Sequence, residues 1–129
     1  MAERLFVYGT LHPQHAPNEI ADVVRRFKRL GEGTVHGRLY DLGDFPAMVL
    51  DQTAGKVNGE VFIIPTDSNA LARLDAYEEY HPSDPKQSLF LRQKTTVDLA
   101  DGTKPECWVY VYNKSLLGHR PQPQFASVA

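Results

Sequence analysis

Three acidic residues close together in the second half of the chain are candidates for acid–base chemistry. Asp75, Glu78 and Glu79 lie at positions i, i+3 and i+4, so a helix brings them into one neighbourhood. Like charges at that spacing, beside Leu74 and Tyr77, raise the pKa of at least one carboxyl group toward the range useful to an acid–base catalyst. The alternative is a solvated helix end, which the spacing alone favours.

A second candidate lies where a short apolar segment near the N-terminus meets a glycine. Residues 4–8 carry a continuous apolar run, which predicts a strand buried on both faces that stops at Gly9. A buried strand that breaks at glycine leaves backbone N–H groups unpaired, and these can form a concave site for a carboxylate. Such a loop is also a common way to end a strand.

Other kinds of chemistry have weaker support. Glycines within residues 31–37 follow a predicted helix and precede a strand, the reverse of a dinucleotide-binding loop. His12 and His15 have no acidic or cysteine ligand at a known spacing, so we expect surface histidines and no metal. Cys107 lies within a predicted strand, where a small buried hydrophobic residue is expected rather than a nucleophile.

Length, charge and cysteine content limit the class of protein. The chain has 129 residues, a formal charge of −2 and one cysteine, so it has no broad basic surface and can form no internal disulfide. No apolar run approaches the roughly 20 residues of a membrane span, and residues 1–4 do not resemble a signal peptide. We expect a cytoplasmic protein with no nucleic-acid or membrane partner; its oligomeric state stays open.

Hydrophobic periodicity predicts six strands and two helices. The strands are expected at residues 4–8, 35–40, 47–50, 57–64, 90–99 and 106–113. One helix is expected from residue 18 to Gly31, with a solvated basic face at 25–29, and another from residues 65–68 to about residue 79. Alternation on the last strand predicts one face with Cys107, Val109 and Val111 and another with Trp108, Tyr110 and Tyr112.

This order of elements predicts an α+β fold. We expect a small, mostly antiparallel curved sheet or barrel with two flanking helices. Residues 1–115 are expected to form a single domain, and residues 116–129, which contain two prolines and no periodic pattern, a mobile tail.

Five segments in the same order resemble motifs of the gamma-glutamylcyclotransferase-like family, which includes the AIG2-like proteins. The segments are residues 6–11 (FVYGTL), 37–47 (GRLYDLGDFPA), 57–62 (VNGEVF), 74–78 (LDAYE) and 108–113 (WVYVYN). The resemblance implies the family's small barrel-like fold with a cavity at one end. It also implies cofactor-independent release of 5-oxoproline from a gamma-glutamyl amine or peptide, which is lyase or acyltransferase chemistry on a small molecule.

The resemblance also assigns roles to residues. Glu78 matches the family's catalytic glutamate, and the loop expected to hold the gamma-glutamyl group consists of Tyr8, Gly9, Thr10 and Leu11. Further residues expected to line or tune the cavity are Asp75, Arg92 and Tyr110. Because successive helical residues point about 100° apart, Glu78 should face this loop and be more buried than Glu79. The rival function is a non-catalytic module that binds a small ligand.

The chain departs from the family pattern at three places. Position 79 is Glu where relatives often have Gly, which puts a second carboxylate beside Glu78. The segment 90–92 (FLR) resembles a Tyr-x-Arg strand motif but lacks its hydroxyl group. The usual Gly-x-Trp ending is absent, and Gly118 is followed by a proline-containing tail.

Overall fold

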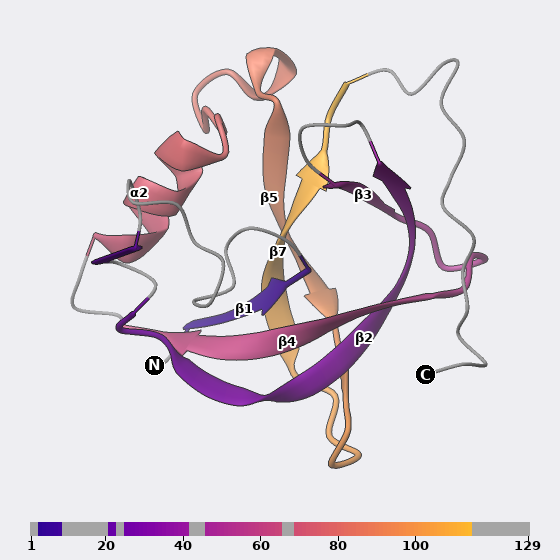
Figure 1. Cartoon of the computed structure of the whole chain (residues 1–129). Helices are drawn as coiled ribbons and strands as arrows, with labels where there is room; N and C mark the ends of the chain where they lie inside the picture. The colour runs from indigo at the N-terminus through magenta and orange to yellow at the C-terminus, as the bar shows by residue number, and fades with distance from the viewer. Residues whose placement is uncertain (1–2, 9–20, 23–24, 42–45, 66–68, 115–129) are drawn as a thin grey trace.

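One curled sheet organises the protein (Figure 1). The computed structural model describes residues 3–8, 21–22, 25–41, 46–65 and 69–114. Its strands are β1 (Glu3–Val7), β2 (Lys28–Asp41), β3 (Pro46–Leu50), β4 (Lys56–Ile64), β5 (Phe90–Thr96), β6 (Asp98–Leu99) and β7 (Glu106–Tyr112). The order is β3-β2-β4-β1-β7-β5, and β6 pairs with β2. Only the β1–β7 pair is parallel among the described pairings, so the predicted mostly antiparallel α+β fold is confirmed.

β1 lies in the middle of the sheet and is buried on both faces, as its continuous apolar run predicts. Leu5 and Val7 belong to a cluster on the face that packs against helix α2 (Ala70–Tyr77). Phe6 belongs to a second cluster, inside the curl of the sheet. In Figure 1, β2 and β4 curve together around one side, and β5 and β7 cross them. The sheet therefore separates two cores, and alternate residues of one strand serve different cores.

The second strand begins earlier than predicted. Lys28 and Arg29, expected on the solvated face of a helix, instead start β2 and pair with β4. Arg29 forms an ion pair across the strands with Glu60. The register shifts between Arg29 and Gly31, so Leu30 bulges outward and is 43% exposed. Cross-strand pairing thus overrides the helical spacing of this segment, a tertiary effect that periodicity does not report.

The first predicted helix, at residues 18–31, is described only at residues 21–22 and 25–31, and from Lys28 onward the chain is strand rather than helix. Residues 21 and 22 are helical, and the N–H of Arg25 donates to the carbonyl of Ala21. Helix α2 begins at Ala70, with Asn69 as its N-cap, and a one-turn 3₁₀ helix spans Pro85–Gln87. The tail at residues 116–129 also lies outside the described residues. None of the described helices is long and apolar enough to span a membrane.

The predicted strand at residues 90–99 is divided in two. β5 pairs with β7, whereas β6 turns away and pairs with Gly33 and Thr34 of β2. A Cβ at Gly33 would lie 2.7 Å from Cγ1 of Val97, so glycine allows this close approach. Val97, between the two strands, is fully buried, and its N–H donates to the carbonyl of Pro105.

Candidate active site

Helix α2 ends in a hydrogen-bonded turn that fixes the position of Glu78. The N–H of Glu78, the C-cap residue, donates to the carbonyl of Leu74 at 2.9 Å. The N–H of Tyr80 donates to the carbonyl of Asp75 at 2.8 Å, and that of Glu79 to the carbonyl of Ala76 at 3.2 Å. These last two bonds form a Schellman motif, which satisfies carbonyls left free at a helix end.

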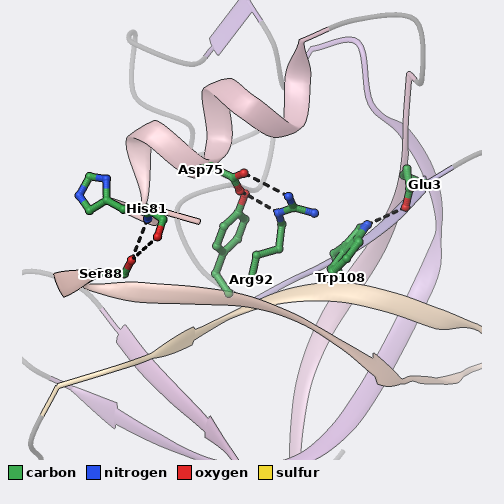
Figure 2. A network of polar contacts seen from close by, with 7 residues as sticks. Glu3, Asp75, His81, Ser88, Arg92 and Trp108 are labelled. Atoms are coloured by element: carbon green, nitrogen blue, oxygen red, sulfur yellow. Dashed lines mark hydrogen bonds and ion pairs between the residues drawn. The ribbon is translucent and has the colours of Figure 1, made fainter. Parts of the chain in front are cut away.

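The segment after the helix is also held in place. The N–H of Leu89 donates to the carbonyl of Glu79 at 3.0 Å. Ser88 is fully buried, and its hydroxyl oxygen accepts the N–H of His81 at 2.7 Å (Figure 2). Residues 79–89 therefore form a closed loop that holds the end of α2 from its C-terminal side.

The carboxyl group of Glu78 is perturbed by its surroundings. Glu78 is partly buried, whereas Glu79 is exposed, in the order that the helix rotation predicts. Burial, and secondly the charge of Glu79, raises the pKa of Glu78 to about 7. A carboxyl group with that pKa can both accept and donate a proton near neutral pH.

Two tyrosine hydroxyl groups lie within the electrostatic reach of Glu78. The hydroxyl of Tyr8, the residue after β1, donates to the backbone carbonyl of Tyr110 on β7 at 2.6 Å. Burial raises the pKa of Tyr8, and the charge of Glu78 raises it further. The pKa of Tyr110 is raised by burial, by Asp75 and, to a smaller extent, by Glu78. The charge of Glu78 at the end of α2 thus acts on Tyr8, after β1, and on Tyr110, within β7, and both tyrosines are neutral at neutral pH.

Asp75, Tyr110 and Arg92 form one buried polar network, of which Figure 2 labels Asp75 and Arg92. The hydroxyl of Tyr110 donates to Oδ1 of Asp75 at 2.7 Å. Arg92 donates to both carboxylate oxygens, from Nε at 2.8 Å and from a terminal nitrogen at 3.2 Å. Asp75 is only 8% exposed, so its charge is compensated by the guanidinium group rather than by water. The network ties α2 to β5 and β7.

This network removes Asp75 from the group of three carboxylates that were predicted to repel one another. Asp75 is paired with Arg92, and the charge that raises the pKa of Glu78 comes from Glu79. The expected rise in a carboxyl pKa occurs at Glu78. Its first cause is burial, and the repelling charge comes from Glu79 alone. The spacing i, i+3, i+4 could not reveal this, because Arg92 comes from another element.

Sequence reasoning missed the residues that surround Arg92. Its guanidinium lies 4.3 Å from the ring centroid of Trp108 and 5.9 Å from that of Tyr80. The indole N–H of Trp108 donates to a carboxylate oxygen of Glu3 at 2.6 Å (Figure 2). The predicted alternation of the last strand places Trp108 on the same face as Tyr110, and this pattern could have indicated that Trp108 lies near the polar network.

The remaining predicted residues divide into described and undescribed ones. Gly9, Thr10 and Leu11 lie outside the described residues, as do His12 and His15. Cys107 is fully buried on the opposite face of β7, where burial raises the pKa of its thiol to about 11. Its thiol is therefore protonated at neutral pH. In the described parts of the chain, His, Cys, Asp and Glu form no group of three suited to a metal ion.

Comparison with known proteins places these features in a family. A family model described as gamma-glutamyl cyclotransferase, AIG2-like, matches residues 5–127. A protein of Halalkalibacterium halodurans, provisionally named a gamma-glutamylcyclotransferase, is 38% identical over 78 residues, which are 60% of this chain and 64% of that protein. The similarity thus spans just under two thirds of that relative.

Two solved structures share the fold. The crystal structure of an AIG2-like protein from Mus musculus has a TM-score of 0.70 at 21% identity, covering 94% of this chain and 86% of that one. The solution structure of YtfP from Escherichia coli has a TM-score of 0.62 at 28% identity, covering 92% and 90% of the two chains. Since the family model covers most of the sequence, this chain belongs to the gamma-glutamyl cyclotransferase, AIG2-like family.

Proposed function

We propose that the protein is a gamma-glutamyl cyclotransferase in which Glu78 is the general acid and base. The observation that carries this proposal is the partly buried carboxyl group of Glu78 at the C-cap of α2, whose pKa is raised to about 7. An ordinary glutamate near pKa 4.5 is a weaker base and holds almost no proton at neutral pH. The family relationship supplies the substrate class.

The reaction proceeds within one substrate molecule. The α-amine of the gamma-glutamyl group attacks its own γ-carbonyl carbon, and the new C–N bond closes a five-membered ring. Glu78 accepts the proton that this nitrogen loses and donates it to the leaving nitrogen as the original C–N bond breaks. The products are 5-oxoproline and a free amine. No cofactor is required.

Two physical effects account for the rate. Binding the substrate in a bent conformation makes the attack intramolecular and well oriented, an effect that can contribute about 7–11 kcal/mol. A positioned acid–base group contributes typically about 10²–10⁴-fold. The proposed binding element for the substrate carboxylate or developing oxyanion is the backbone of the loop that follows Tyr8.

The surroundings of Glu78 support this division of roles. Asp75 is occupied by Arg92 and Tyr110, so we assign it to holding the helix end and not to proton transfer. Tyr8 and Tyr110 are neutral, and each donates its one hydroxyl proton within the protein, so their hydroxyl oxygens are left to accept a hydrogen bond from a substrate. We further propose a small-molecule substrate and a reducing, cytoplasmic setting, in keeping with the single unpaired Cys107.

A product assay tests the proposal. The purified protein is incubated with a panel of gamma-glutamyl amines and gamma-glutamyl dipeptides, and 5-oxoproline is measured together with the released amine. We expect equal amounts of the two products from at least one member, and none with Glu78→Gln. Binding of panel members without any product would instead support the non-catalytic module.

A further inference from the structure

Glu79 occupies a backbone position that normally belongs to glycine. Its φ is 56°, and among the described residues it is the one non-glycine residue with positive φ. A side chain with a Cβ is strained in this left-handed region, which is why glycine is preferred at the position after a helix C-cap. The residue type at position 79 therefore works against the conformation it adopts.

The backbone contacts alone impose this conformation. The Glu79 N–H donates to Ala76, its carbonyl accepts from Leu89, and the next N–H closes the Schellman motif on Asp75. None of these hydrogen bonds involves the Glu79 side chain. A glycine would make the same turn with less strain, so the carboxylate is not needed to end the helix.

What the Glu79 carboxylate does affect is its neighbour. Glu78 is partly buried, and in the described ranges no ion pair includes it. The charge of Glu78 acts on Tyr8, the residue after β1, and on Tyr110 of β7, while Asp75, one turn earlier in α2, is paired with Arg92 of β5. The tyrosines are neutral and the ion pair carries no net charge, so Glu79 supplies the uncompensated negative charge beside Glu78.

We propose that Glu79 is a positioning residue whose carboxylate, held beside Glu78 by the turn, makes Glu78 a stronger base, at the expense of backbone strain at the helix end. This role rests on the proposed function, in which Glu78 must take the proton of the attacking amine and hold it until the leaving nitrogen receives it. Strained residues persist at functional sites where the surrounding structure determines their conformation, as it does at Glu79.

Three substitutions separate the charge of Glu79 from its backbone. Glu79→Gln removes the charge and keeps the strain, Glu79→Gly removes both, and Glu79→Asp keeps the charge on a side chain that tolerates the left-handed region better. The control is Glu106→Gln, an exposed carboxylate at the first residue of β7. The titration of the Glu78 side-chain carbon is followed by NMR, and thermal unfolding is measured on the same samples.

We expect the Gln and Gly variants to lower the titration midpoint of Glu78 by about half a pH unit, because a nearby like charge is lost. The Asp variant and the control should keep the midpoint of the unmodified protein. The Gly variant should unfold at a higher temperature than the Gln variant, by about 2–5 °C. The acid limb of kcat/KM against pH should move with the titration midpoint.

An unchanged Glu78 midpoint in Glu79→Gln would overturn the proposal, since that variant leaves the turn intact. A Gly variant no more stable than the Gln variant would overturn the strain argument. Because titration and unfolding need no substrate, both results are obtained even if no panel member is cleaved. Failure of the proposed catalytic function is thereby distinguished from failure of the role of Glu79.

Discussion

The two faces of the sheet are built from alternate residues of the same strands, yet they differ in chemistry. The face inside the curl is apolar, and its buried residues are Phe6, Val35, Met48, Val57, Val61, Val97, Leu99, Cys107, Val109 and Val111. The face beneath α2 contains apolar residues and also the buried network of Asp75, Arg92 and Tyr110. One face supplies packing, and the other supplies packing together with positioned charge.

This difference explains where a perturbed carboxyl group can exist. A buried charge needs a partner, and in a purely apolar core it would be strongly destabilising. Under α2 the Arg92 guanidinium compensates the charge of Asp75. Glu78 lies at the C-terminal end of α2 and is only partly buried. Partial burial therefore raises the pKa of Glu78 and still allows its carboxylate form to exist.

The largest expected effect comes from removing the proposed acid–base group on the polar face. Glu78→Gln keeps the shape of the side chain but cannot exchange a proton in the reaction, so turnover should fall at least about 100-fold. Circular dichroism should show an unchanged fold. Equal turnover in the variant and the unmodified protein would exclude the proposed mechanism.

The next effect tests whether the polar network holds the helix to the sheet. Asp75→Asn leaves the largely buried guanidinium of Arg92 without a charged partner, and the free energy of unfolding should fall by about 2–3 kcal/mol. Turnover should decrease less than in Glu78→Gln, because Asp75 is not assigned to proton transfer.

A matched control is Asp98→Asn, which removes an exposed ion pair with Lys104 and should cost less than about 1 kcal/mol. Urea unfolding compares the two variants. Similar losses of unfolding free energy in the two variants would show that burial does not make the Asp75–Arg92 pair more stabilising than the exposed pair.

A substitution on the apolar face should affect stability but not chemistry. Val109 is fully buried one residue before Tyr110, with its side chain on the opposite face. Val109→Ala removes two carbon atoms and leaves a small cavity, so the free energy of unfolding should fall by about 2 kcal/mol. Turnover per folded molecule should be unchanged at a temperature well below unfolding. A large loss of turnover would show that the two faces are not independent.

The smallest effect is a pH dependence of stability due to Glu78. Its raised pKa means that the folded state binds the proton more tightly than the unfolded chain does. Its stabilising contribution is therefore complete below about pH 4.5 and is lost as the pH rises through about 7. Glu78→Gln lacks this loss, so it should match the unmodified protein at pH 4 and exceed its unfolding free energy by about 1–2 kcal/mol at pH 8. Denaturant titrations at both pH values measure the difference, and a constant difference would contradict the raised pKa.

Much of the fold could be predicted from the sequence where local pattern and tertiary structure agree. The two faces of β7 follow directly from alternation, and the unbroken apolar run of β1 predicts its burial on both faces. The start of β2 was not predictable in this way. Its first residues have helical spacing but gain more by pairing with β4, and that partner is about 30 residues away in the chain.

The site shows the same limit. The spacing of the acidic residues determines that they come together at a predicted helix end, because helix geometry depends only on local sequence. The direction of Glu79 is set by the turn that follows α2, where its φ is 56°. The sequence also contains Asp75, Arg92 and Trp108, but nothing in their spacing connects them. Only the tertiary structure decided that Arg92 compensates Asp75, and that Glu78 is buried enough for its pKa to rise to about 7. Electrostatic environment depends on which charges meet through space and on how much water is excluded, and neither is a local property of the chain.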